Sequence, residues 1–194
     1  MVHWLTILIA AAALPAATSK ADKAAPPPPP PPPEVRTRTP AEAFVVDGSA
    51  VSIRTFRVVL TGVEVLERSQ QCERAGRFEA CGQYAARRLA SLIQGRDVAC
   101  AIVADLGRPD VLRGRCFAGG VDLAQVLVDE GLAVGLRGTV YGAASLQACL
   151  ARRGAWAGAF EAPWTVRARA AGDAVAPKLL GLGAKTPCAS ALRG

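Results

Sequence analysis

Hydrophobic and polar positions alternate along the stretch between Val45 and Glu67. The apolar positions of this alternation are Val51, Ile53, Phe56, Val58 and Leu60. A period of two residues is typical of half-buried β-strands. Asp47 and Gly48 predict a turn, and Gly62 interrupts the second apolar run. The stretch therefore predicts two short strands joined by a turn.

Three acidic residues flank these strands. Asp47 lies in the turn, and Glu64 and Glu67 follow the second strand. If the strands belong to a barrel, the three carboxylates meet at one rim, where they form a candidate calcium site, because Ca²⁺ binds through several oxygen ligands. The alternative is that Asp47 accepts hydrogen bonds within its own turn, and that Glu64 and Glu67 are solvated loop acids.

Three later segments carry helix signals. Residues 82–93 have the period of an amphipathic helix, and Gly95 ends it. Asp122 is an expected N-cap for a helix over residues 123–130. A third helix is expected over residues 143–153.

Strands are expected around these helices, at residues 97–103, 113–117 and 132–136, while residues 69–81 are expected to form a polar loop. The order is then strands, helix, strands, helix, strand, helix. This order favours an α+β fold, a small Greek-key β-barrel of the oligonucleotide-binding (OB) type with about three packed helices.

The chain is expected to contain four regions. Residues 1–19 have the features of a signal peptide, with an uncleaved membrane anchor as the alternative. Residues 20–41 form a proline-rich linker, in which the eight prolines at 26–33 favour an extended rod, either a spacer or a ligand for a proline-binding module. Residues 42–167 form one domain, and residues 168–194 form a tail with little structure.

Six cysteines in an exported chain predict three disulfides and a secreted or periplasmic location. Six cysteines allow fifteen connectivities, so spacing alone leaves the pairing open. Position suggests two of the pairs, because two cysteines flank one loop and two others lie on strands that are expected to be neighbours. The two remaining cysteines would then form the third pair. These pairs are Cys72 with Cys81, Cys100 with Cys116, and Cys149 with Cys188.

Histidine chemistry is excluded from the mature chain, because the only histidine, His3, would leave with the signal peptide. No CxxC spacing occurs either, which disfavours a zinc site. Most of the net charge of +7 lies outside residues 42–167. Within residues 42–167, arginines and acids interleave and no lysine occurs. Nucleic acid is therefore only weakly supported as a partner.

The stretch VVDGSAVSIRTFRVVLTGVEVLE resembles the opening of the thermonuclease (staphylococcal-nuclease-like) family, VVDGDT…RVRLxGIDxPE. Ser49 and Glu64 keep the fifteen-residue spacing that the family commonly has between two of its acids. The blocks at residues 115–133 and 151–164 also match, so the resemblance covers nearly the whole domain. It implies the same OB-type barrel, and the first two cysteine pairs resemble the exported, cysteine-bearing branch of the family.

The resemblance implies a reaction in which a Ca²⁺ polarises a phosphate, a glutamate activates water and two arginines neutralise the charge that develops on oxygen. The glutamate falls on Glu67, and the second metal-binding acid falls on Glu64. Asp47 matches the first acid of the family turn. The other metal-binding acid falls on Ser49, and the two arginines fall on Val59 and Val111.

Arg57 and Arg113 are possible substitutes, because each lies two residues from one of these valines and shares its strand face. Two residues correspond to about 6.5 Å along a strand, which is more than a catalytic clamp tolerates. Glu67 is then a vestigial general base, and Asp47 and Glu64 are a weak calcium site.

The expected function is that of an exported thermonuclease-family domain with impaired catalysis. Such a pseudoenzyme would act as a monomeric binding or scaffold module, without a cofactor, for an envelope or extracellular partner. No transmembrane segment is expected after cleavage of the signal peptide. The alternative is a Ca²⁺-dependent endonuclease that hydrolyses DNA or RNA with an altered active site.

Overall fold

The computed structural model describes residues 30–181 and Cys188. The chain divides into two compact units, residues 1–31 and 32–194, and only Pro30 and Pro31 of the first are described. The predicted signal peptide and residues 20–29 of the predicted linker lie outside the described residues. No helix in the described part of the chain is long and apolar enough to cross a membrane.

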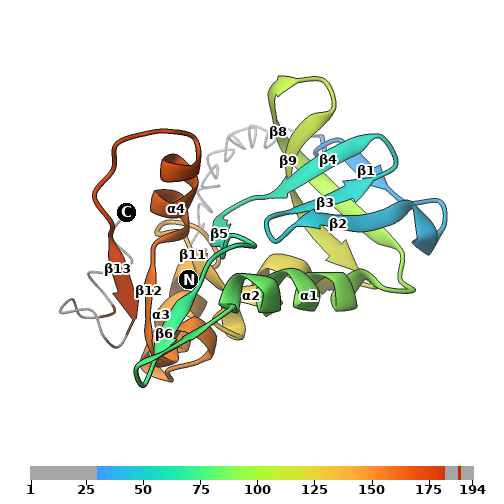
Figure 1. Ribbon diagram of the computed structural model, residues 1–194. Helices are drawn as coiled ribbons and strands as arrows, with labels where there is room; N and C mark the ends of the chain where they lie inside the picture. Colours follow the sequence, from blue (N-terminus) through green and yellow to red (C-terminus); the bar gives the residue numbers. More distant parts are fainter. Residues whose placement is uncertain (1–29, 182–187, 189–194) are drawn as a thin grey trace, which may run out of the picture. The chain divides into compact units, whose positions relative to one another are not determined.

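A curled sheet of seven strands forms the larger half of unit 32–194 (Figure 1). Its order is β1 (Glu34–Arg36), β8 (Val98–Arg108), β9 (Val111–Ala118), β4 (Phe56–Leu60), β3 (Ala50–Ile53) and β2 (Ala43–Asp47), and β10 (Val121–Asp122) pairs with β9. The sheet is mixed, because β4 and β9 run parallel while the other pairs are antiparallel. This pairing brings β4 beside a strand that follows it by some fifty residues in the sequence.

The remaining strands of the described residues form two smaller sheets. One pairs β5 (Val63–Val65) with β11 (Ala133–Gly135). The other has the order β13 (Leu179–Gly181), β12 (Ala159–Glu161), β6 (Cys72–Arg74) and β7 (Arg77–Glu79).

Four α-helices occur among the described residues, together with the short 3₁₀ helices η1 (Pro40–Glu42) and η2 (Gly154–Ala157). The α-helices are α1 (Cys81–Ile93), α2 (Leu123–Asp129), α3 (Gly142–Leu150) and α4 (Pro163–Ala170). The α+β class is confirmed, and α4 is additional to the three helices expected. The predicted cap of α2 is also confirmed, because Oδ1 of Asp122 accepts hydrogen bonds from the amides of Ala124 (3.1 Å) and Gln125 (3.2 Å).

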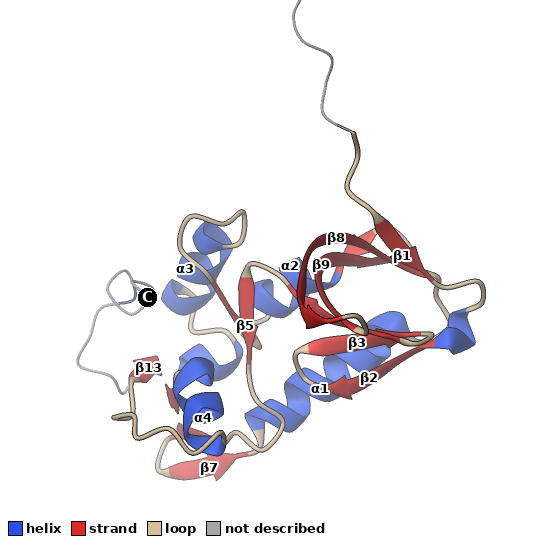
Figure 2. Ribbon diagram, turned by 90° about the horizontal axis from the view of Figure 1, so that it is seen from above, coloured by secondary structure: helices blue, strands red, loops and turns tan. Residues whose placement is uncertain are grey.

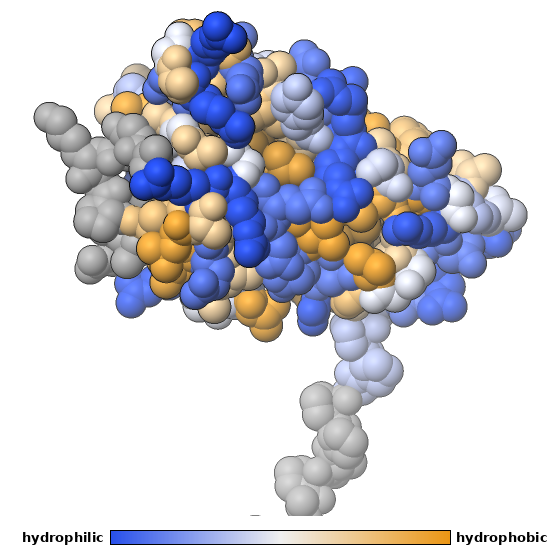
Figure 3. All heavy atoms as spheres, turned by 90° about the horizontal axis from the view of Figure 1, so that it is seen from below, coloured by the Kyte–Doolittle hydropathy of each residue, from blue (hydrophilic) through white to orange (hydrophobic). Residues whose placement is uncertain are grey.

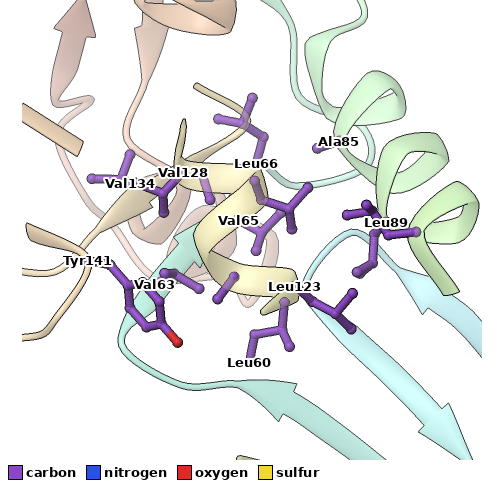
Figure 4. Packing of buried hydrophobic residues seen from close by; sticks show 14 of the residues in the cluster. Leu60, Val63, Val65, Leu66, Ala85, Leu89, Leu123, Val128, Val134 and Tyr141 are labelled. Carbon is purple, nitrogen blue, oxygen red and sulfur yellow. The ribbon is translucent and has the colours of Figure 1, made fainter. Parts of the chain in front are cut away.

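The hydrophobic core surrounds α2, which lies between α1 and the segment that carries Val134 and Tyr141 (Figure 4). Leu123 of α2 and Leu89 of α1 are fully buried. A fully buried leucine contributes about 1.5–3 kcal/mol relative to an exposed one. The surface on the side seen in Figure 3 is largely hydrophilic, with apolar areas between the hydrophilic residues.

The stretch from Val45 to Glu67, predicted as two strands, contains the end of β2 and the whole of β3, β4 and β5. The missed turn lies at Arg54 and Thr55, where Arg54 has a φ of 56°. Neither residue is a usual turn former at a positive φ, so the sequence did not predict a turn there. In addition, β3 is buried on both faces and not half-buried.

Residues 69–81, predicted as a loop, contain the hairpin β6–β7. Its turn uses Ala75 and Gly76, both with positive φ. Strand β6 also pairs with β12, through Cys72 and Phe160. This short strand is therefore stabilised by a partner that lies far away in the sequence.

The segments that flank the predicted domain also contain regular structure. The predicted linker contributes β1 and η1, and Val35 pairs with Cys100 of β8. The predicted tail contains the end of α4 and β13, whose Leu180 is fully buried.

The three expected disulfides are present: Cys72–Cys81, Cys100–Cys116 and Cys149–Cys188. Cys100 and Cys116 are directly paired residues of β8 and β9, with a Cα–Cα distance of 4.0 Å. No free cysteine occurs among the residues described. Each disulfide is expected to stabilise the fold by about 2–4 kcal/mol.

Candidate functional site

A pocket of about 250 Å³ lies where β4, β5, β9 and α4 meet. Figure 2 shows α4 near β5 on one side and the curled sheet on the other. Three arginines and one glutamate line the pocket, namely Arg57, Arg113, Arg167 and Glu64. Its remaining wall is mainly apolar, and Ser49 adds a hydroxyl.

The strand register explains why two of these arginines share the pocket. Val59 of β4 pairs with Arg113 of β9, and Arg57 pairs with Val111. Paired residues of parallel strands, and residues two apart on one strand, point to the same face of a sheet. Each valine at a position where the resemblance implies an arginine therefore lies directly beside an arginine on the neighbouring strand.

Asp47 is bound to its own turn and to Arg57. Its Oδ1 accepts hydrogen bonds from the amide (2.9 Å) and the hydroxyl (2.8 Å) of Ser49, and its Oδ2 forms an ion pair with Nη2 of Arg57. Burial by itself would raise the pKa of Asp47, but the hydrogen bonds from Ser49 and the charge of Arg57 outweigh it and lower that pKa. Asp47 thus acts as a turn cap, which was one of its two predicted roles.

Arg167 of α4 joins the other two acids. Its Nη1 donates to Oε1 of Glu67 at 2.9 Å, and its Nη2 forms an ion pair with Oε2 of Glu64. Both carboxylates are only 22% exposed. Burial raises the pKa of Glu67, and the negative charges of Asp47 and Glu64 act in the same direction, while Arg167 opposes them. Glu67 therefore lies close enough to the other acids to sense their charge.

Sequence reasoning missed Arg167, because this residue lies 100 positions from Glu67. The available signal was Pro163, since proline is favoured in the first turn of a helix. That signal could have predicted α4, but not what the arginine contacts.

Arg113 differs from the other two arginines of the pocket. Within the described part of the chain, its guanidinium forms no ion pair, hydrogen bond or ring contact. The side chains of Asp47, Glu64 and Glu67 balance the charges of Arg57, Arg113 and Arg167 overall, but Arg113 takes no part in these pairings.

The residues present do not fit a calcium ion. Ca²⁺ takes six to eight oxygen ligands, whereas the carboxylates of Asp47 and Glu64 are each engaged by a guanidinium. Across residues 30–181 and Cys188, no group of three or more His, Cys, Asp or Glu side chains is arranged to hold a metal.

The predicted site residues nevertheless lie together. Arg57, Arg113 and Glu64 line one pocket, Asp47 is joined to it through Arg57, and Glu67 is joined through Arg167. The two-residue offset from the implied positions does not remove either arginine from the site. The structure thus gathers the site residues more closely than the sequence alone indicated.

A larger pocket, of about 420 Å³, lies between the β6–β7 hairpin and α1 and includes the Cys72–Cys81 disulfide in its wall. Its two arginines, Arg74 and Arg88, are paired with acids. It contains none of the predicted catalytic or metal-binding residues, so the smaller pocket is the better candidate for chemistry or recognition.

Comparison of the sequence with models of protein families gives no match, and comparison with curated proteins gives none either. The class of protein is therefore defined by the fold and the site alone. It is a disulfide-bonded α+β domain with a curled mixed sheet and a pocket, lined by three arginines and a glutamate, beside the central strands of that sheet.

Proposed function

We propose that this chain is an exported, thermonuclease-like domain that no longer hydrolyses phosphodiesters and acts as a binding module. The observation that carries the proposal is the pairing of the site acids with arginines. Asp47 is held by Arg57, and both Glu64 and Glu67 are held by Arg167.

Hydrolysis of a phosphodiester needs fixed cations that face the phosphate and a free base that activates water. Val59 and Val111 carry no charge, and Arg57 and Arg167 already neutralise acids, so Arg113 is the one unpaired arginine among the described residues that line the pocket. Arg167 donates a hydrogen bond to Oε1 of Glu67 and opposes the rise of its pKa, which weakens this carboxylate as a base towards water. Loss of one preorganised contact of this kind commonly lowers a rate by about 10²–10³.

The OB-type barrel is part of the same proposal. It is supported by the curl of the mixed seven-stranded sheet and by α1, which packs on β2. Export is supported by the three disulfides, which form and persist in oxidising compartments. The partner would then be an envelope or extracellular molecule.

A zymogram with DNA and RNA, with and without Ca²⁺, tests the loss of catalysis. We expect no digestion by the purified chain in either condition. Clear Ca²⁺-dependent digestion that disappears in Glu67→Ala would contradict the proposal.

A second candidate function is favoured by one observation, since Arg57 and Arg113 line the same pocket as Glu64. These arginines would replace the two missing cations of an altered Ca²⁺-dependent endonuclease. Calcium binding tighter than about millimolar, measured by calorimetry, would support this candidate. Under the first proposal, Ser49→Asp combined with Arg167→Gln is expected to raise calcium affinity above that of the unaltered chain, because it adds a carboxylate and releases two.

A further inference from the structure

The pocket beside α4 combines an apolar wall with one cation that is not neutralised. Val59, Leu106 and Leu136 contribute to the wall, and Arg113 supplies the cation. Leu106 is 39% exposed, so part of this wall faces solvent. Small-ligand sites usually combine apolar walls with a small number of polar groups that fix the orientation of the ligand.

The charges in the pocket favour a ligand with a single negative charge. Arg57 and Arg167 already neutralise acids, so Arg113 alone can bind an anion without breaking an ion pair. Glu64 lies in the same wall and would repel a doubly charged phosphate more strongly than a singly charged carboxylate. A carboxylate also matches the planar fork of a guanidinium.

The size of the pocket limits the rest of the ligand. Its volume of about 250 Å³ corresponds to roughly eight water molecules at about 30 Å³ each. This volume lies below the usual range of about 300–1,000 Å³ for drug-sized ligands. A short aliphatic or aromatic group therefore fits within it.

We propose that the pocket binds an apolar carboxylate, with the carboxylate on Arg113 and the apolar group against Val59, Leu106 and Leu136. The inference rests on the proposed function, since it names the ligand class of that binding module. The same chemistry occurs in a free short-chain acid and in the C-terminal residue of a peptide.

Calorimetric titration of the full chain tests this inference with four probes and inorganic phosphate. Hexanoate represents the free acid, and N-acetylleucine represents a peptide C-terminus. Hexanamide and N-acetylleucinamide are the neutral counterparts. We expect at least one carboxylate to bind with a 1:1 ratio, about 10- to 100-fold more tightly than its amide, because a hydrogen bond to a charged group accounts for a factor of that size.

Arg113→Gln is expected to abolish the preference for the carboxylate over its amide. Because Arg113 is exposed, this variant is expected to fold as the unaltered chain does. Arg77→Gln is the matched control, because Arg77 is an exposed arginine of β7 outside the pocket. It should leave both affinities unchanged. The carboxylate that binds more tightly identifies the source of the ligand.

The inference would be overturned by no binding of either carboxylate, by equal binding of acid and amide, or by tighter binding of phosphate. An equal loss of affinity in Arg77→Gln and Arg113→Gln would also overturn it. The proposed function is judged separately by the zymogram. Digestion that requires Glu67 defeats that function, whereas the absence of both digestion and carboxylate binding defeats only the present inference.

Discussion

Replacing Arg167 with glutamine removes the cation that holds Glu64 and Glu67 together. The two ion pairs link α4 to β5 and to the loop that follows β5. Without the guanidinium, two partly buried carboxylates lose the counter-ion that they share. The variant should therefore be less stable than the unaltered protein.

The magnitude follows from the exposure of the three groups. Exposed ion pairs contribute about 0–1 kcal/mol, whereas breaking a buried pair costs about 3–5 kcal/mol. Arg167 is 47% exposed and its partners are 22% exposed, so the site lies nearer to the first limit. We expect a loss of about 1–2 kcal/mol, which lowers Tm by roughly 2–8 °C in a domain of this size.

Arg169→Gln is the matched control, because Arg169 lies on the same helix and pairs with a single acid, Glu161, at similar exposure. Its expected cost is about 0–1 kcal/mol. Urea unfolding at neutral pH measures both variants. The difference between them should disappear when Glu64→Gln and Glu67→Gln are added to Arg167→Gln, since the repulsion is then gone.

The pH dependence gives a second check on Arg167. Burial raises the pKa of Glu67 above its ordinary value of 4.5, and Arg167 opposes that rise. As the pH falls through the raised pKa of Glu67, its carboxylate becomes protonated and its ion pair with Arg167 is lost. The Arg167→Gln variant and the unaltered protein should therefore converge in stability. Equal costs for Arg167→Gln and Arg169→Gln at every pH would refute the reasoning.

Three further predictions concern the frame of the site. Gly82→Ala should destabilise by about 2 kcal/mol or more, measured by urea unfolding, because a Cβ there would lie 1.7 Å from the carbonyl oxygen of Glu67. Asp122→Ala should cost about 2–3 kcal/mol, because it removes a helix cap and the acceptor of the Tyr141 hydroxyl. It should also lower the pKa of Tyr141, which burial and the charge of Asp122 raise to about 12, in a spectrophotometric titration. Because the pKa of Asp47 is lowered in the folded protein, its contribution to stability is complete above the ordinary value of 3.8. That contribution is lost as the pH falls through the lowered pKa. The stability advantage of the unaltered protein over Asp47→Asn should therefore shrink in that acid range.

Local patterns in the sequence predicted much of the fold. Alternating positions such as Val58 and Leu60 are buried in β4 as expected. The helices over residues 82–93 and 123–130 begin and end within one residue of α1 and α2. These elements follow from periodicity and end signals, which depend only on nearby residues.

Other parts of the fold had no local signal. The turn at Arg54 contains no glycine, proline or asparagine, and its positive φ is imposed by the pairing of β3 with β4. Strand β6 is short and polar, and it acquires its structure from β7 and β12. The structure of this turn and of β6 therefore depends on tertiary packing.

The sequence by itself indicated the three acids of the candidate site, because Asp47, Glu64 and Glu67 flank the strands with the alternating pattern, but it did not indicate Arg167. Only the tertiary structure decided which cation each acid meets. Arg167 reaches Glu64 from 103 positions away, and Arg113 lies beside Val59 through a parallel pairing. The physical reason is that an ion pair depends on distance in space, and no local pattern in the sequence encodes the distance between residues on separate elements.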